Sequence, residues 1–158
     1  MSLDLSKFDT EKFDINSKAF KVFWAMFEND RVSKWLGIEP LVIEEGYNEL
    51  KMIVRDDMLN GFDILHGGIL FSFADSSFAF ATNSFGKMSV SINVNINYHE
   101  AVREGDVLIT RTKLVNQTNK LCNLNVDLFK LESNNNKKLV GSFYGTAYRT
   151  SKDFNLWF

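Results

Sequence analysis

The chain has 158 residues, 45% of them hydrophobic and 24% charged, with a formal net charge of −2 at pH 7. This length suits one domain with a sizeable core, which we assign to residues 1–158, and the near-neutral charge argues against a nucleic-acid partner. The single cysteine, Cys122, excludes an intrachain disulfide, and no apolar stretch fits a signal peptide or membrane helix, so we expect a cytoplasmic protein with no membrane partner.

Apolar periodicity predicts an N-terminal helical region over about 15–36, followed by two strands. The segment 38–56 reads as these strands, joined by a turn near 45–46, and the glycine-containing segment 57–68 reads as a loop. Gly37 is suited to end a second, short helical turn. The first helix would present one aromatic face, formed by Phe20, Phe23, Trp24 and Phe27.

The segment from about Ile69 to Asn83 is apolar nearly all round, which is typical of a helix buried on most sides. Valine and isoleucine alternate with serine and asparagine over 89–99, which predicts a half-buried strand. Three more strands are expected at 107–115, 121–131 and 138–150, separated by short polar loops. This order predicts an α+β fold, with an antiparallel sheet wrapped around one apolar helix and a core over about 37–151.

One carboxylate, Asp75, lies inside the apolar segment HGGILFSFADSSFAFA at 66–81. A buried carboxylate without partners is costly and has a raised pKa, which makes Asp75 a candidate general base or nucleophile. Alternatively, Asp75 caps a helix that starts there, with ILFSF as a strand before it. A single helix accounts more simply for the glycines at both ends of the segment.

The glycine pair Gly67–Gly68 also has two interpretations. It is either a flexible turn or a place where a ligand approaches the unpaired N–H groups of a helix N-terminus, which can stabilise an oxyanion. Gly67 and Asp75 are eight residues apart, about 12 Å along a helix, so one carbonyl group cannot contact both. If both act on the same bond, they belong to different subunits of a two-fold dimer with antiparallel helices.

The segments MLNG and HGGILFSFADSSFAFATNSFG, with MFENDRVSKWLGI upstream, resemble the hotdog-fold acyl-CoA thioesterases. The resemblance is greatest to the phenylacetyl-CoA thioesterase branch associated with phenylacetate degradation. It covers about residues 20–150 and is densest over 58–86. It implies a long central helix in a curved antiparallel sheet, and a homodimer that can pair into a homotetramer. It also implies hydrolysis of a small or aryl-acetyl CoA substrate with no metal and no cofactor.

The resemblance also implies roles for individual residues. Asp75 corresponds to the general base or nucleophile, and the Gly67 N–H of the partner subunit corresponds to the donor that polarises the thioester carbonyl. Asn60 corresponds to a residue that places the attacking water or the carboxylate. The remaining residues implied at the carbonyl, the substrate or the water are His66, Gly68, Ser91 and Ser89.

Other polar residues have less specific interpretations. His66 is equally consistent with direct participation and with a supporting hydrogen bond in the loop. We expect His99 at the surface without an evident partner, and Cys122 as a buried, inert thiol. No spacing indicates a zinc site, a Rossmann site or a P-loop. Basic residues that could bind the CoA phosphates are Lys87, Arg111, Lys113, Lys120 and Arg149.

Two other functions remain open at this point. The same fold could hydrate or dehydrate an acyl thioester, which would need His66 and Asp75 to act as a pair. It could also bind acyl-CoA without cleaving it, although the combination of Asn60, Gly67 and Asp75 argues against a degenerate site.

Overall fold

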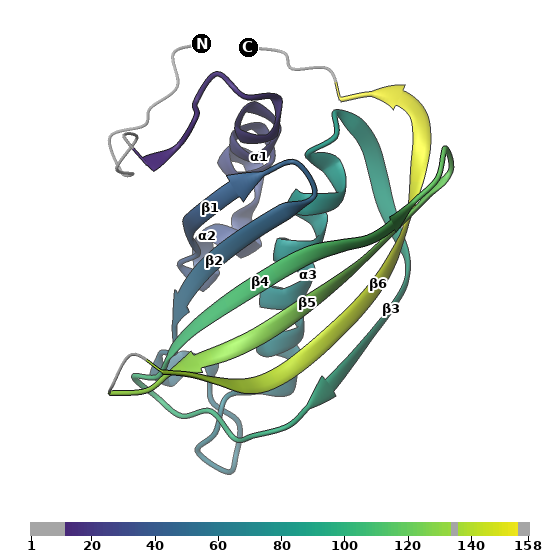
Figure 1. Ribbon diagram of the computed structural model, residues 1–158. Coiled ribbons are helices and arrows are strands. Elements are labelled where there is room, and N and C mark those ends of the chain that lie inside the picture. The colour runs from purple at the N-terminus through teal and green to yellow at the C-terminus, as the bar shows by residue number, and fades with distance from the viewer. Residues whose placement is uncertain (1–11, 134–135, 155–158) are drawn as a thin grey trace.

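The computed structural model describes residues 12–133 and 136–154, and six antiparallel strands form one sheet that curls around a central helix (Figure 1). The strand order is β1-β2-β4-β5-β6-β3. The segments 1–11, where we expected no signal peptide, and 155–158 lie outside the described residues. The elements are α1 (Lys18–Asn29), α2 (Arg31–Leu36), β1 (Glu39–Glu44), β2 (Tyr47–Ile53), η2 (Asp56–Met58), α3 (Gly67–Asn83), β3 (Lys87–Tyr98), β4 (Val107–Gln117), β5 (Leu121–Leu131) and β6 (Lys137–Asp153).

The fold class predicted from the sequence is confirmed, because the sheet wraps around α3 as in a hotdog fold. Helix α3 begins at Gly67, two residues earlier than expected, and runs without interruption to Asn83. The alternative in which Asp75 caps a separate helix is therefore wrong. The short turn expected before Gly37 is a six-residue helix, α2.

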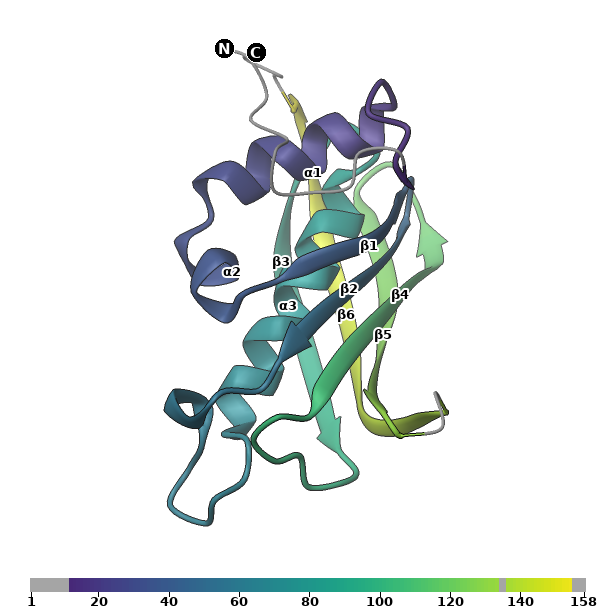
Figure 2. The same cartoon turned by 90° about the vertical axis from the view of Figure 1, so that its left-hand side faces the viewer.

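The N-terminal helix α1 covers the C-terminal end of α3 (Figure 2). Ser17 caps α1, since its hydroxyl oxygen accepts a hydrogen bond from the Phe20 N–H at 3.1 Å. The aromatic face of α1 then packs on α3, with the Phe23 and Phe80 ring centroids 4.9 Å apart in an edge-on arrangement. The chain turns sharply at Asp30, which ends α1 and caps α2.

The sheet approaches α3 closely at Gly145 on β6. A Cβ atom at this position would lie 2.4 Å from the Phe78 ring, so any larger residue would displace that ring. Phe78 in turn packs on Phe143, with ring centroids 5.7 Å apart. This glycine therefore lets the concave face of the sheet close on the helix.

A buried polar cluster joins the middle of α3 to two strands. The Ser77 hydroxyl oxygen lies 2.5 Å from Asn48 Oδ1, 2.8 Å from Thr110 Oγ1 and 2.7 Å from Thr112 Oγ1. The Asn48 amide donates to the Ser77 carbonyl at 2.8 Å. All four residues are almost completely buried, so the cluster satisfies polar groups that would otherwise be costly and fixes the rotation of α3 against the sheet.

Strand β3 forms one edge of the sheet, and a bulge interrupts its pairing with β6 between Ser91 and Asn93. The simple alternation predicted for this strand is therefore wrong, because an extra residue moves the following side chains to the other face. Val90 and Ile92 are 54% and 57% exposed, whereas Val94 packs against the core. Beyond the bulge, every second side chain from Val94 onward faces α3, and the last of them is Tyr98, the final residue of the strand.

Candidate active site

The first turn of α3 is fixed by His66, which is the N-cap of the helix. Its Nδ1 atom accepts a hydrogen bond from the Gly68 N–H at 2.9 Å, so the neutral ring carries its proton on Nε2. The backbone N–H of Gly67 makes no hydrogen bond within the described residues. The cap thus uses one of the glycine donors and leaves the other available at the positive end of the helix.

Tyr98, which the sequence analysis did not single out, holds this turn from the side. Its hydroxyl donates to the Gly67 carbonyl oxygen at 3.1 Å. Its ring lies 3.2 Å from the position that a Cβ atom at Gly67 would occupy. A larger residue at position 67 would therefore require a small shift of the Tyr98 ring, and the orientation of the Gly67 peptide is set by this side chain from β3.

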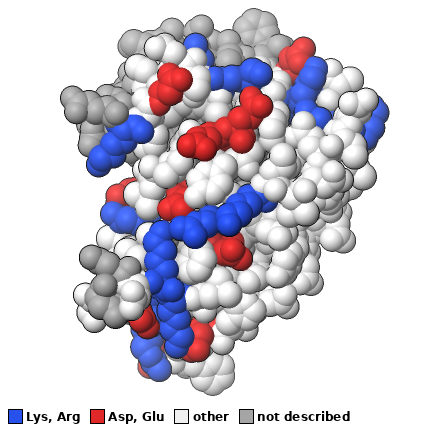
Figure 3. Space-filling model, in the orientation of Figure 1, with Lys and Arg blue, Asp and Glu red and all other residues white. Residues whose placement is uncertain are grey.

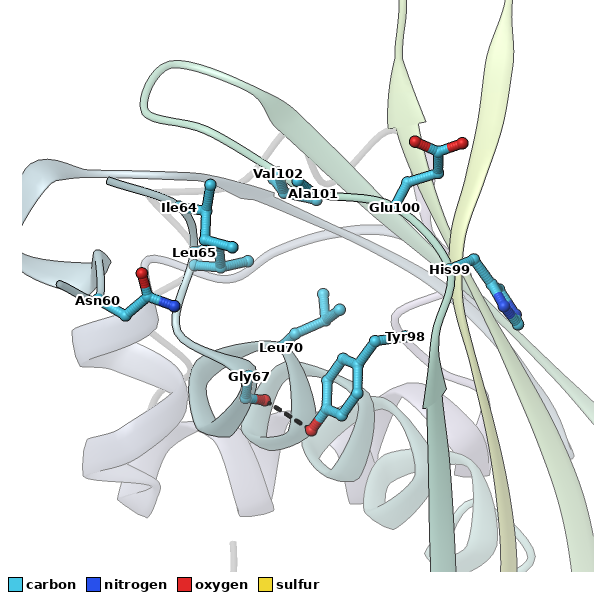
Figure 4. Close-up of a pocket in the computed structure, with 10 residues that line it drawn as sticks. All are labelled: Asn60, Ile64, Leu65, Gly67, Leu70, Tyr98, His99, Glu100, Ala101 and Val102. Carbon is cyan, nitrogen blue, oxygen red and sulfur yellow. Dashed lines mark hydrogen bonds between the residues drawn. The ribbon is translucent and has the colours of Figure 1, made fainter. Parts of the chain in front are cut away.

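Asn60 lies in the loop that precedes α3, which an isolated bridge between Leu59 and Leu65 closes. The Asn60 Oδ1 atom accepts from the Phe62 N–H at 2.9 Å, and its backbone N–H donates to the Ile64 carbonyl at 2.8 Å. These bonds shape a compact turn and leave the side-chain amide nitrogen directed toward the cavity beside it (Figure 4).

A cavity of about 340 Å³ lies between this loop, the first turn of α3 and the segment after β3 (Figure 4). Its wall is mostly apolar, and Asn60, Gly67 and Tyr98 contribute polar groups to it. The side chains of His99 and Glu100 turn away from its centre. An apolar cavity with a few converging polar groups suits a small organic ligand. The lining residues are Asn60, Ile64, Leu65, Gly67, Leu70, Tyr98, His99, Glu100, Ala101 and Val102.

Asp75 lies two turns further along α3, and it is not part of this cavity. Its carboxylate accepts no hydrogen bond within the described residues, and its side chain is only partly shielded from solvent. Burial raises the pKa of Asp75 above its ordinary value, and the nearby carboxylate of Asp30 raises it further. One chain therefore brings Asn60 and Gly67 together and leaves Asp75 apart, as the helical spacing required.

The two serines predicted for the site lie on β3, and neither lines the cavity. The backbone of Ser89 exchanges two hydrogen bonds with the Asn83 side chain, and its hydroxyl donates to the Lys87 carbonyl at 3.1 Å. Ser89 thus ties β3 to the end of α3. Ser91 is exposed and lies opposite the buried Ala147, which places it on the helix side of the sheet edge.

Two further residues differ in how well the sequence anticipated them. Cys122 is fully buried, and burial raises the pKa of its thiol to about 11, which confirms an inert thiol. His99 is exposed as expected, but it has a partner, because its Nε2 atom lies 3.0 Å from the Ser142 hydroxyl.

The basic residues considered for CoA phosphates are mostly engaged elsewhere. Arg111 pairs with Glu49 at 2.8 Å on the outer face of the sheet, where acidic and basic side chains are interspersed (Figure 3). Arg149 donates to the Thr118 carbonyl at 2.7 Å. Lys87 pairs with Asp153, and Lys120 lies over the Tyr148 ring.

The described parts of the chain contain neither a metal-binding cluster nor a membrane-spanning helix. Between residues 12 and 154, apart from 134–135, no group of three or more His, Cys, Asp or Glu side chains is arranged to hold a metal ion. No helix among the same residues is long and apolar enough to cross a membrane.

The chain is similar to known proteins in both sequence and structure. A family model described as the thioesterase superfamily matches residues 62–135. Acyl-coenzyme A thioesterase PaaI of Escherichia coli (strain K12) is 33% identical over 135 residues, which cover 85% of this chain and 94% of that protein. The structure of the E. coli PaaI protein from the phenylacetic acid degradation operon superimposes with a TM-score of 0.81 at 32% identity, covering 86% of this chain and 96% of that chain.

Two other relatives extend this comparison. A candidate esterase of Archaeoglobus fulgidus is 38% identical over 129 residues, covering 82% of this chain and 81% of that protein. A thioesterase protein from Streptococcus pneumoniae TIGR4, solved with coenzyme A, superimposes with a TM-score of 0.67 at 25% identity, covering 73% of this chain and 90% of that chain. The chain therefore belongs to the thioesterase superfamily. Within it, the chain is a thioester hydrolase of the hotdog fold and is similar to PaaI.

Proposed function

We propose that the protein hydrolyses acyl-CoA thioesters with a small or aryl-acetyl group, with Asp75 as the general base or nucleophile. The observation that carries this proposal is the unpaired Gly67 N–H at the start of α3, in a residue that lines an apolar cavity beside Asn60. A backbone donor at a helix N-terminus is suited to the negative charge that develops on a thioester oxygen. The E. coli relative is named an acyl-coenzyme A thioesterase, which supports CoA as the thiol.

The proposal requires a homodimer in which each cavity receives Asp75 from the other subunit. The exposed side of α3 supports this, because it presents Gly68, Ser72, Asp75 and Ala79 at helical spacing, and their small side chains permit a close approach between helices. Strand β3 supports it too, since its edge position would let two copies join their sheets. An antiparallel pair of α3 helices would bring Asp75 to Gly67 of the partner subunit, twice over.

In this arrangement the ionised Asp75 takes a proton from water, and the water oxygen attacks the carbonyl carbon of the thioester. The Gly67 N–H of the partner subunit stabilises the oxyanion, and Asn60 orients the water or the carboxylate. Collapse of the tetrahedral intermediate breaks the C–S bond, and the proton passes from Asp75 to the leaving sulfur. As a nucleophile, Asp75 would instead form a mixed anhydride that water then hydrolyses. Its raised pKa makes the ionised carboxylate a stronger base than an ordinary aspartate.

The central test measures thiol release from phenylacetyl-CoA, benzoyl-CoA and short straight-chain acyl-CoAs. We expect turnover by the wild-type protein, with the highest kcat/KM for a small or aryl-acetyl substrate, and a loss of about 100-fold or more in Asp75→Asn. Wild-type turnover that Asp75→Asn retains would refute the role of Asp75. The absence of thiol release from every substrate would refute the thioesterase itself.

A complementation experiment tests the shared site. Asp75→Asn and Gly67→Pro are each expected to be inactive, but a heterodimer of the two contains one site with both wild-type residues. Equal mixing after subunit exchange should restore roughly a quarter of the wild-type activity, because half of the dimers are mixed and one of their two sites is intact. No recovery, with subunit exchange verified by native mass spectrometry, would place Asp75 and Gly67 in the same subunit's site. The mass spectrum also distinguishes the dimer from the tetramer that the resemblance implies.

The hydratase alternative would pair a histidine with Asp75. Within one chain His66 caps α3 two turns away from Asp75, so such a pair, like the proposed thioesterase site, would need the partner subunit. A panel that includes an enoyl-CoA distinguishes the two reactions, because hydration consumes the substrate without releasing thiol.

A further inference from the structure

The corner between α1 and α2 contacts α3 next to Asp75, and the mechanism above does not use it. Asp30 occupies this corner as the N-cap of α2. One of its carboxylate oxygens accepts hydrogen bonds from the Val32 N–H at 2.9 Å and the Ser33 N–H at 3.1 Å. The other accepts a bond from the Ser33 hydroxyl at 2.5 Å. The position of this carboxylate is therefore fixed by three donors.

Ser33 continues this arrangement to α3. Its hydroxyl oxygen lies 2.9 Å from that of Ser76, which follows Asp75 in the helix. A serine hydroxyl has one proton, and the short bond to the Asp30 carboxylate uses the proton of Ser33. The Ser76 hydroxyl therefore donates to Ser33, and Ser33 donates to Asp30. Ser33 is fully buried, whereas Asp30 and Ser76 are half-buried, so this chain of hydrogen bonds is partly shielded from water and defines the distance between the corner and the Asp75 turn.

The Asp30 charge also acts directly on Asp75. Burial is the largest cause of the raised pKa of Asp75, and the Asp30 charge is the second. No other charged group of the described chain is among the causes. Helix α3 packs against α1, α2 and all strands from β2 to β6. Other charged residues on these elements, none of them among the causes of the raised pKa of Asp75, include Lys21, Glu28, Arg31, Lys34, Glu49, Lys87, Arg111 and Arg149.

We infer that Asp30 is a positioning residue of the reaction: held by Ser33, it fixes the turn of α3 that carries Asp75 and maintains a negative charge beside that carboxylate. The inference rests on the proposed role of Asp75 as base or nucleophile. A fixed like charge makes the ionised carboxylate more reactive toward a proton or a carbonyl carbon, and it disfavours the close approach of further anions. The α1–α2 region thereby contributes to the chemistry as well as covering α3.

The deciding variant is Asp30→Asn, because asparagine is an equally good N-cap whose side-chain oxygen can keep the bonds from the Val32 and Ser33 N–H groups, while its amide nitrogen removes the charge and reverses the bond with the Ser33 hydroxyl. We expect the acid limb of the kcat/KM profile to move to lower pH, and kcat on the plateau to fall because the base is weaker. Asp30→Ser, another good N-cap, serves as a second uncharged variant if the first does not fold. Asp153→Asn is the matched control, since Asp153 is an exposed aspartate that pairs with Lys87 and is not among the causes of the raised pKa of Asp75. The acid limb of this variant should stay at the wild-type position.

A second readout separates this inference from the proposed function. Titration of the Asp75 carboxyl carbon by NMR reports its pKa whether or not the protein turns over a thioester. A lower pKa in Asp30→Asn than in wild type supports the inference, and an unchanged titration with an unchanged acid limb refutes it. If Asp75→Asn keeps wild-type activity, the proposed function fails, and the NMR titration still decides whether Asp30 acts on Asp75.

Discussion

The two halves of α3 handle their polar groups in opposite ways. In the middle and C-terminal half, Ser77 is bonded to two strands, and Asn83 is bonded to the backbone of Ser89. Before Ser76, the Gly67 N–H in the first turn is left without a partner beside a cavity, and Asp75, two turns further on, accepts no hydrogen bond within the described chain. Paired polar groups hold the helix in the sheet, whereas the unpaired ones are available for a ligand. The contrast predicts where substitutions cost stability and where they cost activity.

The largest effect is expected from removing the unpaired donor. Gly67 is the first residue of α3, and His66 before it has extended dihedrals, with φ −61 and ψ 130. Both positions are therefore compatible with a proline at 67, which would delete the N–H and keep the helix. We expect kcat of Gly67→Pro to fall by about 10²–10³-fold.

The matched control for this prediction is Gly67→Ala. It adds the same Cβ atom near the Tyr98 ring but keeps the N–H, so its activity should lie well above that of the proline variant. Equal losses in both variants would assign the effect to crowding against Tyr98 instead of to the donor. Circular dichroism at 222 nm checks that the helix is intact in both.

In the buried polar cluster around Ser77, a substitution is expected to lower stability and to leave activity almost unchanged. Ser77→Ala removes the hydroxyl that bonds Asn48 Oδ1 and the Thr110 and Thr112 hydroxyls, which should lower the free energy of unfolding by about 1–3 kcal/mol. Activity per folded molecule should remain close to that of wild type. Urea unfolding measures the difference, and Ser72→Ala on the same helix is the control, because the Ser72 hydroxyl bonds to the Gly68 carbonyl near the surface. A loss of activity without a loss of stability would contradict the division between the two halves.

A smaller effect is expected at Tyr98, which supports the first turn from β3. Tyr98→Phe keeps the ring and removes the hydrogen bond to the Gly67 carbonyl. A bond of this kind contributes about 1 kcal/mol, so kcat/KM should fall roughly fivefold. The loss should appear in kcat if the tyrosine orients the donor. A change confined to KM would indicate that the hydroxyl contacts substrate.

The smallest effect concerns stability as a function of pH. Because the folded pKa of Asp75 is raised, folding is opposed by its charge above that pKa, and this cost disappears as the pH falls toward the ordinary value of 3.8. Asp75→Asn should therefore melt at a higher temperature than wild type near neutral pH, and the difference should vanish at acidic pH. Thermal unfolding of both proteins in parallel measures it. A difference that is constant with pH would exclude titration of Asp75 as the cause.

The sequence predicted the elements of this fold well because their signals are local. The alternating and helical patterns, the glycines and the polar loops gave six strands, the long helix and the approximate boundaries. The resemblance, carried by residues 58–86, gave the candidate site. The shape of the cavity and the partners of the site residues were not available from local patterns.

Tyr98 and Asp30 show why local patterns did not predict the cavity or the partners of the site residues. Tyr98 was read as one more member of an alternating strand, and the bulge at Ser91–Asn93 that directs it toward α3 depends on pairing with β6. Asp30 lies inside the helical region predicted over about 15–36, and its proximity to Asp75 arises from a contact between residues 43 positions apart, Ser33 and Ser76. Both relations depend on the tertiary fold, which periodicity along one segment does not encode.

The edge strand β3 has a consequence for solution behaviour. From Met88 to Tyr98 it carries no charged residue and no proline, and three of its apolar side chains, Met88, Val90 and Ile92, are exposed. Lysine, proline and bulges are the usual protection of such an edge against adding foreign strands, and here only the bulge is present. If the proposed dimer covers this edge, a monomer produced by dilution or by an interface mutation should be prone to aggregation, and the melting temperature should rise with protein concentration.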